Sequence, residues 1–384
     1  MAERTVVVLG GGIGGLVAAR RLRARLERGD RVVLVERDPI YRFAPSFLWV
    51  MTGARRPEQV TADLRRLRRH EIEVLEAQVE AIDRESKTVT TSAGEIPYDR
   101  LAVALGAELA PEALPGFAEA AHNVYTLEGA AAAGRALREL EGGRIAVLVS
   151  RLPYKCPAAP YETALLAEAV LRKRGVRARS TIDVYTPEPL PMPTAGPAMG
   201  EALLGILEGR GVGFHREQTV ERIDPEAREL VLAGGERTPY DLLLGVPPHR
   251  PPAVLQESGL AAGGFVPVDR KTLQTTVDAS VFAVGDVTAI PIAGSRFLPK
   301  AGVFAHGQAE VVAQRIADEL RGRVSVALFD GNGSCFLEMG DGVAAYATGD
   351  FYAETGPQVA LRRPGRHWHL AKVAFEKYWL RRWF

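Results

Sequence analysis

Cysteine is scarce in this sequence. The 384 residues include only two, Cys156 and Cys335. Their wide separation excludes a CxxC redox pair and a cysteine-based zinc site, and no metal site is predicted. Taken singly, each cysteine is expected to be a small buried apolar residue.

Long apolar runs and a dominant charge are also missing. No run reaches the roughly 18 residues of a membrane-spanning helix, and the first strand begins within five residues of the start, so we expect no signal peptide. The net charge of +1 gives no reason to expect nucleic acid as a partner. A content of 47% hydrophobic and 25% charged residues is typical of a globular protein, here long enough for two or three domains.

A complete dinucleotide-binding pattern begins the chain. It comprises a strand, a helix and a second strand, expected over residues 5–9, 16–26 and 31–35. The glycines that fit the G-x-G-x-x-G spacing are Gly10, Gly12 and Gly15. They allow a tight turn and close approach of a pyrophosphate to the helix N-terminus. Glu36 ends the second strand and can bind the hydroxyls of an adenosine ribose, with Arg37 beside it as a further expected cofactor contact.

Two later motifs favour FAD over NAD. Residues 277–286 form an expected strand that ends in Gly285 and Asp286, similar to the second FAD signature of flavoproteins with two dinucleotide-binding domains. Residues 98–107, with Gly106, resemble the crossover motif of the same proteins. Alone, Asp286 could equally be a turn residue. Three motifs in this order predict FAD.

The expected fold is α/β, with two Rossmann-like domains and a small C-terminal region. The predicted parts are an FAD-binding domain in two segments, a degenerate NAD(P)-like domain between them, and a hairpin-helix region, at 1–108 with 266–325, 109–265 and 326–384. The inserted domain is expected to contain strands at 144–149 and 180–185 and helices at 159–174 and 198–210. After its first strand, prolines, Lys155 and Cys156 replace the glycine loop, and no acidic residue ends its second strand, so nicotinamide binding is not expected.

The C-terminal region combines a hairpin with an aromatic helix. Asp341 and Gly342 mark the hairpin turn, and because such hairpins often make dimer contacts, a homo-oligomer is among the expected partners. The helix, expected over 368–384, holds three of the four tryptophans, interleaved with lysines and arginines. One broad stripe is expected to contain Trp368, Ala371, Phe375, Tyr378 and Trp379. This mixture suits a membrane interface; the alternative is a helix docked on the core or on a partner.

Three segments resemble the sulfide:quinone oxidoreductase and flavocytochrome c sulfide dehydrogenase family. They are Lys155–Glu162 with its Cys-Pro-x-x-Pro-Tyr-Glu element, Gly333–Cys335, and Leu298–Gly302. The resemblance covers nearly the whole chain. It implies that Cys156 and Cys335 form a redox pair over the flavin, with Cys335 nearer the flavin C4a atom, which replaces the expectation of two inert cysteines.

The resemblance also assigns two charged residues. Lys300 matches a lysine beside the flavin N1–C2 edge, where negative charge develops on reduction; otherwise it is a surface lysine. Glu162 matches an acid six residues after the cysteine, a candidate general base; otherwise it is stabilised by the start of its helix. Both belong with Cys156 and Cys335 to the predicted catalytic set.

The sequence departs from the family at several positions. Many quinone-reducing relatives carry a third cysteine where this chain has Tyr125, and histidines near Gly129 and residues 192–196 that it lacks. This leaves the proton route and the length of the sulfur chain open. The cytochrome-linked relatives attach FAD through a cysteine, but residues 41–47 contain none, so FAD is expected to be non-covalent.

The leading hypothesis is oxidation of sulfide or polysulfide through Cys156, Cys335 and FAD, with membrane quinone as acceptor. Hydrosulfide attacks a Cys156–Cys335 disulfide or bridged sulfur, which leaves a persulfide and a thiolate. Phe375, Tyr378 and Trp379 are predicted to line the quinone entrance of a peripheral membrane protein. The sequence does not assign the side of the membrane to which it binds. The alternatives are a subunit that serves a cytochrome c, an NADH:quinone dehydrogenase, and a flavoprotein acting on another sulfur compound.

Overall fold

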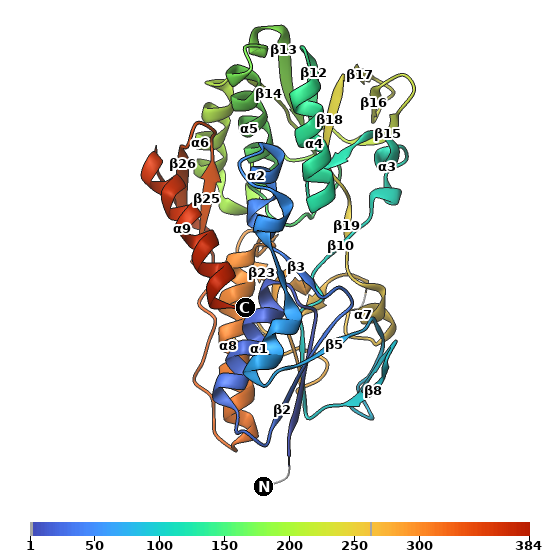
Figure 1. The fold of residues 1–384 in the computed structure, drawn as a ribbon, viewed down its shortest axis with the longest axis vertical. Helices are drawn as coiled ribbons and strands as arrows, with labels where there is room; N and C mark the ends of the chain where they lie inside the picture. Colours follow the sequence, from blue (N-terminus) through green and yellow to red (C-terminus); the bar gives the residue numbers. More distant parts are fainter. Residues whose placement is uncertain (1–2, 262) are drawn as a thin grey trace.

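The computed structural model describes residues 3–261 and 263–384. Figure 1 shows two lobes stacked along the long axis, with helix α9 running along one side of both. The lower lobe carries the first dinucleotide-binding pattern and the upper lobe carries the inserted region.

The lower lobe is built on a five-stranded parallel sheet in the order β21-β9-β1-β2-β5. Its strands are β1 (Thr5–Leu9), β2 (Arg31–Glu36), β5 (Glu73–Glu76), β9 (Arg100–Val103) and β21 (Val281–Ala283). The long helices α1 (Ile13–Arg25) and α8 (Gly302–Leu320) lie side by side against it. Continuous β-branched runs form the central strands because both faces of a parallel sheet are covered; Val7, for example, is fully buried between Val33 and Leu101.

Smaller elements complete this lobe. The strands are β3 (Ile40–Arg42), β4 (Thr61–Asp63), β6 (Val79–Asp83), β7 (Thr88–Thr91), β8 (Gly94–Pro97), β20 (Val266–Pro267), β22 (Thr288–Ala289), β23 (Pro291–Ile292) and β24 (Arg296–Phe297). The helices are η1 (Ala44–Ser46), η2 (Pro57–Val60), η3 (Leu64–His70), α7 (Ala253–Glu257) and η7 (Gly285–Val287), whereas α2 (Phe47–Met51), which follows η1, lies in the upper lobe. Helix α2 reaches upward, and its apolar side chains pack in the core of the upper lobe.

The upper lobe repeats the parallel architecture in the order β11-β18-β12-β13-β14. Its strands are β11 (His122–Asn123), β12 (Gly143–Val149), β13 (Ser180–Tyr185), β14 (Val212–His215) and β18 (Leu242–Val246), and its helices are α3 (Phe117–Ala120), α4 (Leu127–Glu139), α5 (Ala159–Lys173) and α6 (Pro197–Glu208). Short 3-10 turns are η4 (Pro111–Ala113), η5 (Arg177–Arg179) and η6 (Pro193–Ala195), and an antiparallel ribbon follows as β15 (Val220–Asp224), β16 (Glu229–Leu232) and β17 (Arg237–Pro239). The second Rossmann-like unit is therefore present, as predicted.

The two lobes are joined by a pair of antiparallel strands. The chain enters the upper lobe through β10 (Glu108–Leu109) and returns through β19 (His249–Arg250). Beyond β19, Leu255 and Leu260 already pack in the lower core. The exact division of the chain into domains stays a prediction.

The C-terminal region contains one strand more than predicted. Strands β25 (Asn332–Glu338), β26 (Ala344–Asp350) and β27 (Gln358–Gly365) form an antiparallel sheet, and α9 (Arg366–Arg382) follows. The predicted hairpin turn is confirmed, with Asp341 and Gly342 both at positive φ. Strand β27 escaped prediction because its outward positions carry arginine and proline rather than a clear alternating pattern.

Candidate functional site

The predicted phosphate cradle lies between β1 and α1. Gly10 has φ +96°, and a Cβ there would lie 2.5 Å from the carbonyl oxygen of Ala104. A Cβ at Gly15 would lie 1.8 Å from the carbonyl oxygen of Gly10. At Gly12, by contrast, no heavy atom of the described residues lies within 4 Å of the Cβ position. Two glycines therefore permit the turn, while the third faces space at the start of α1, where an anion is stabilised.

Glu36 lies at the end of β2, as predicted, next to this turn. Its Oε2 accepts a hydrogen bond of 2.7 Å from the backbone N–H of Gly11, and its Oε1 accepts one of 3.1 Å from Asp38. These bonds fix the carboxylate and leave further lone pairs for ribose hydroxyls. Arg37 is exposed at the adjoining position.

Gly106 and the Gly285–Asp286 pair approach from the following strands. Gly106 follows β9 with φ +70°, and Gly285 follows β21 with φ +78°. The Gly285 N–H donates to Oε1 of Gln308 at 2.7 Å, which ties this turn to α8. Burial raises the pKa of Asp286, and the positive charges of Lys155 and Lys300 oppose that rise.

Lys300 is a buried residue rather than a surface lysine. It retains 9% of its accessible surface, and its Nζ donates to the backbone carbonyls of Asp286 at 2.7 Å and Thr288 at 3.0 Å. The ammonium also lies 3.4 Å from the ring centroid of Phe265. Burial lowers the pKa of Lys300 to about 8, although the Asp286 charge opposes the shift.

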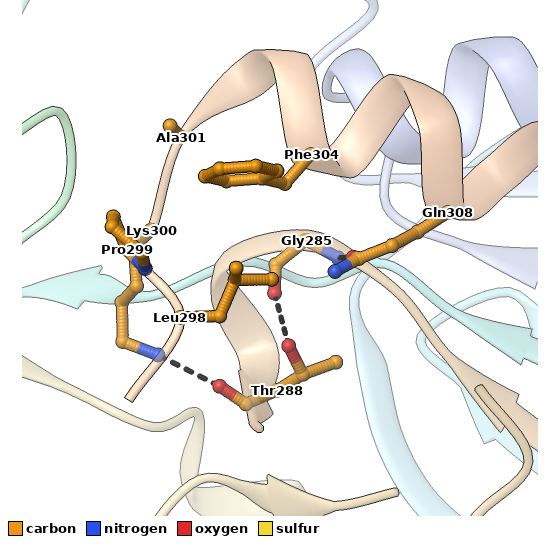
Figure 2. A pocket seen from close by; sticks show the side chains of 8 residues that line it. All are labelled: Gly285, Thr288, Leu298, Pro299, Lys300, Ala301, Phe304 and Gln308. Atoms are coloured by element: carbon orange, nitrogen blue, oxygen red, sulfur yellow. Dashed lines mark hydrogen bonds between the residues drawn. The ribbon is translucent and has the colours of Figure 1, made fainter. Parts of the chain in front are cut away.

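A small pocket opens beside Lys300 (Figure 2). Its lining residues are Gly285, Thr288, Leu298, Pro299, Lys300, Ala301, Phe304 and Gln308. Figure 2 shows the Phe304 ring on one side of this space and Leu298 with Gly285 on the other. The pocket thus unites the second FAD motif with the Leu298–Gly302 segment and the start of α8.

These residues fit FAD. The open position at Gly12 leaves room for a pyrophosphate at the start of α1, and Glu36 is held where an adenosine ribose is expected. A buried cation at Lys300 suits a cofactor that gains negative charge on reduction. The predicted cofactor contacts therefore come together around one end of the lower sheet.

Cys156 is held in a strained conformation at the start of α5. Its φ is +50°, in the left-handed region that non-glycine residues rarely adopt. Its N–H donates to the carbonyl oxygen of Lys300 at 2.6 Å, and its own carbonyl accepts from the Tyr125 hydroxyl at 3.1 Å. The main chain of Cys156 is thus tied to the pocket segment, with Tyr125 on its other side. The structure thus brings together Cys156 and the Lys300 segment, both of which the sequence had assigned to the catalytic set.

Cys335 is placed by the C-terminal sheet. It lies in β25 opposite Ala347 of β26, and its Sγ is 3.2 Å from the carbonyl oxygen of Phe336. Both cysteines carry separate thiols, and both residues are exposed in part although many protein atoms surround their sulfurs. The two thiols interact electrostatically, because a negative charge on Cys335 is, after burial, the largest contribution to the raised pKa of Cys156.

Dense protein around the two thiols disfavours their thiolates. Burial raises the pKa of Cys335 to about 12, with Glu162 adding to the rise. Burial, Cys335 and Glu162 likewise raise the pKa of Cys156 above its usual range. In both cases the positive charge of Lys372 opposes the rise. A cation that acts on both cysteines is therefore Lys372, one of the α9 lysines and arginines that were expected at a membrane interface.

Glu162 is paired rather than open to a substrate. In α5 it is 5% exposed, and its Oε1 accepts from the Glu338 N–H at 2.7 Å and from Lys372 Nζ at 3.2 Å. Burial alone would lower the pKa of Lys372, but the carboxylates of Glu162 and Glu338 raise it. A role for Glu162 as a general base stays a prediction.

Helix α9 docks through charged residues that the sequence did not single out. Glu376 is fully buried and accepts hydrogen bonds from Ser46 at 2.6 Å and Arg55 at 2.9 Å. His369 Nδ1 lies 3.0 Å from Oε2 of the buried Glu338. The docked face is therefore built on Lys372, Glu376 and Trp379, of which only Trp379 belongs to the predicted aromatic stripe. The only sequence signal was the four-residue spacing of Lys372 and Glu376.

The three aromatic residues predicted at the quinone entrance have different surroundings. Trp379 is 2% exposed and donates its Nε1–H to the Tyr41 hydroxyl at 2.9 Å. Phe375 packs on the Phe43 ring, with centroids 5.9 Å apart, and remains 38% exposed. Tyr378 is 59% exposed. Trp379 is therefore buried in the protein, whereas Phe375 and Tyr378 reach the surface, and the place of all three at a quinone entrance stays a prediction.

None of the helices in the described part of the chain combines the length and apolarity needed to cross a membrane. The exposed side of α9 carries Leu370, Phe375 and Tyr378 among arginines and lysines.

Comparison with known proteins agrees with this architecture. The family model described as pyridine nucleotide-disulphide oxidoreductase matches residues 4–309. The sulfide-quinone reductase of Aquifex aeolicus is 28% identical over 394 residues, which cover 98% of this chain and 90% of that protein. The mitochondrial sulfide:quinone oxidoreductase of Mus musculus is 26% identical, over 91% and 78% of the two chains.

A second group of relatives has a different reductant in its name. The type II NADH:quinone oxidoreductase of Staphylococcus haemolyticus is 26% identical, over 89% of each chain. Among solved structures, the sulfide:quinone oxidoreductase of Aquifex aeolicus superposes with a TM-score of 0.90 and 27% identity, covering 99% of this chain and 91% of that one. The predicted resemblance to sulfide:quinone oxidoreductases is confirmed, and the chain belongs to the pyridine nucleotide-disulphide oxidoreductase family.

Proposed function

We propose that this protein oxidises sulfide, or a related sulfur compound, through Cys156 and Cys335 and passes the electrons by way of non-covalently bound FAD to a membrane quinone. One observation carries the proposal: the distant segments that hold the two cysteines are joined at Glu162, whose Oε1 accepts from the Glu338 N–H at 2.7 Å and from Lys372 Nζ at 3.2 Å. One of these cysteines is hydrogen-bonded to the Lys300 segment that lines the expected cofactor pocket. The relatives named for sulfide and quinone support the assignment.

The first proposed step is attack by hydrosulfide on the oxidised cysteine pair. With a pKa of about 12 for Cys335, the reduced pair holds its protons near neutral pH and is a poor nucleophile. For sulfide to be oxidised, the pair must start as a disulfide or bridged sulfur, because the S–S bond is what accepts the electron pair of hydrosulfide. Attack on a disulfide breaks the Cys156–Cys335 bond and forms a new S–S bond, which leaves a persulfide on one cysteine and a thiolate on the other.

The thiolate released is assigned to Cys335. Lys372 stabilises the negative charge as it forms, because a cation close to a buried thiolate lowers its free energy. Cys156 then carries the persulfide on the strained turn that Tyr125 and the Lys300 carbonyl hold in place. When bound, FAD supplies the two-electron acceptor, and Gly12, Glu36 and Lys300 would hold it.

The membrane side of the proposal rests on α9. Its exposed face offers Leu370, Phe375 and Tyr378, with Arg381 and Arg382 at the same end. Apolar and aromatic groups beside cations suit the interface with anionic lipid. Phe375 and Tyr378 would meet a quinone that approaches from the bilayer.

Anaerobic titration of the purified protein tests the function. Sulfide is added to one oxidised sample and NADH to another, while the flavin absorbance near 450 nm is followed. We expect sulfide to bleach the flavin and NADH to leave it unchanged, because the upper lobe lacks a glycine loop at Lys155-Cys156. Cys156→Ser and Cys335→Ser should each abolish bleaching by sulfide while FAD stays bound. Bleaching by NADH but not by sulfide would instead favour an NADH:quinone dehydrogenase.

A soluble acceptor is the remaining alternative. If sulfide-reduced protein passed its electrons to a cytochrome c but not to a short-chain quinone, α9 would be a protein interface and the quinone part of the proposal would fail.

A further inference from the structure

Another buried carboxylate, that of Glu188, is linked to the Cys156 loop by hydrogen bonds. It follows β13 by three residues and is 2% exposed. In a nucleotide-binding βαβ unit, an acidic residue close to the end of the second strand binds the ribose hydroxyls. Here the carboxylate is turned into the protein, so the upper lobe does contain an acid near this strand end, contrary to the sequence analysis.

The Glu188 carboxylate accepts hydrogen bonds from hydroxyl groups of neighbouring side chains. The Tyr154 hydroxyl lies 3.0 Å from both carboxylate oxygens, and the Thr186 hydroxyl lies 3.1 Å from Oε2. The Tyr161 hydroxyl donates to Oε2 as well. Tyrosine hydroxyls thus stand where a ribose would otherwise donate, and both rings are almost fully buried.

The network is attached directly to the cysteine loop. Tyr154 is two residues before Cys156, and its hydroxyl also lies 3.3 Å from the carbonyl oxygen of Pro157, directly after Cys156. One side chain therefore spans both flanks of the strained residue. Tyr161, in contrast, belongs to helix α5.

The fold keeps this carboxylate at an energetic cost. Burial raises the pKa of Glu188 to about 7, although the hydroxyls of Tyr161, Tyr154 and Thr186 oppose the shift. A buried carboxylate usually stabilises a fold less than an apolar side chain of similar size would. Its presence therefore points to a role for the hydrogen bonds that it accepts. Cys156, at φ +50°, needs surrounding contacts to hold its conformation.

We infer that Glu188 is a positioning residue for Cys156: its carboxylate anchors Tyr154, and Tyr154 holds the loop that presents the Cys156 sulfur to its reaction partner. The inference rests on the proposed function only in taking Cys156 as the reacting cysteine. The alternative is that the network has a structural role only and joins β13 to α5.

Tyr154 and Tyr161 form a matched pair of test sites. Tyr154→Phe and Tyr161→Phe each remove one buried hydroxyl from the same carboxylate, but only the first lies on the cysteine loop. The measurement is the rate of iodoacetamide alkylation of Cys156 in dithiothreitol-reduced, desalted holoprotein, followed by peptide mass spectrometry. Cys335 in the same molecules is the internal reference, so a general loss of stability moves both cysteines.

We expect Tyr154→Phe to change the Cys156:Cys335 alkylation ratio at least threefold and to slow flavin bleaching by sulfide at least tenfold. Tyr161→Phe should change each by less than twofold. Equal ratios in the two variants, or no change in either, would overturn the inference.

Glu188→Asp provides the second test and leaves the Tyr154 side chain itself unchanged. It keeps the charge but withdraws the oxygens from both tyrosines, and should shift the alkylation ratio in the same direction as Tyr154→Phe. An unchanged ratio would also refute the positioning role. If sulfide fails to bleach the wild-type flavin, the proposed function fails, while the alkylation ratios still decide the role of Glu188.

Discussion

Lys372 of α9 and Glu162 of α5 form an ion pair across 210 residues of sequence, with 3.2 Å between Nζ and Oε1. Their side chains retain only 9% and 6% of their accessible surface. The C-terminal helix therefore contributes a buried positive charge to the surroundings of both cysteines, beyond any contact with a membrane.

Replacement of Lys372 should impair both stability and chemistry. Lys372→Met leaves Glu162 buried without its partner, which typically costs about 3 kcal/mol or more of unfolding free energy. It also removes the cation that favours the cysteine thiolates, so sulfide-dependent flavin bleaching should slow about tenfold or more. Denaturant unfolding and stopped-flow absorbance measure the two effects.

Lys377→Met is the control for that experiment. Lys377 is on the same helix, but its side chain is 47% exposed, and its partner Glu376 keeps its bond to Arg55. The control should retain nearly normal bleaching. Equal slowing in both variants would show that Lys372 acts only by general charge.

Two glycines in the cradle should respond differently to alanine. Gly12 has φ −67°, and its Cβ position is open, so Gly12→Ala should leave the melting temperature of the apoprotein unchanged while reducing FAD affinity at least tenfold. Gly15→Ala would place a methyl group 1.8 Å from the Gly10 carbonyl oxygen and should lower that melting temperature. Flavin fluorescence titration and calorimetry separate the two results. Normal FAD affinity in Gly12→Ala would place the pyrophosphate elsewhere.

The buried Lys300 should make apoprotein stability depend on pH in a specific window. Its folded pKa of about 8 lies below the ordinary value of 10.5, so between these values the unfolded chain binds more protons than the folded one. Unfolding free energy should therefore rise with pH from about 8 to about 10.5, by roughly 3 kcal/mol at most. Denaturant titrations of wild type and Lys300→Met should differ by this slope. Parallel curves would mean that Lys300 stays charged throughout.

Membrane attachment should depend on the exposed side of α9. The double variant Leu370→Ser with Tyr378→Ser removes two large exposed apolar groups from this face and should weaken binding to phosphatidylglycerol-containing vesicles at least tenfold. The matched control is Val324→Ser with Val326→Ser, which changes side chains 95% and 90% exposed outside α9. Vesicle sedimentation measures the difference. An equal loss in both double variants would contradict attachment through α9.

Local patterns predicted the dinucleotide cradle well. Strands Thr5–Leu9 and Ser180–Tyr185 have the predicted bounds, and the predicted helix at 159–174 is Ala159–Lys173. Each has a strong local signal, either a β-branched run or a helical apolar pattern. The glycine spacing and Glu36 followed from the same short stretch, because phosphate binding needs those residues at those positions.

The charged groups around the cysteines could not be read in this way. Because other lysines and arginines of the same helix surround Lys372 in the sequence, we expected it to face a membrane. Only the docking of α9 shows that it is buried. Glu188 was missed because it comes three residues after its strand, and its hydrogen bonds to two tyrosines have no local sequence signal. The partnership of Cys156 with Cys335 came from the family resemblance, since spacing alone excluded any local pair.

The sulfur site also has an order of construction. Cys156, Cys335 and Lys372 leave the ribosome in that sequence, and Cys335 follows Cys156 by on the order of ten seconds or more at ordinary rates of synthesis. A growing chain thus holds one cysteine without its intended partner until β25 has formed, and it lacks the stabilising cation until α9 docks. The reactive centre is therefore completed last, after the dinucleotide cradle can already exist.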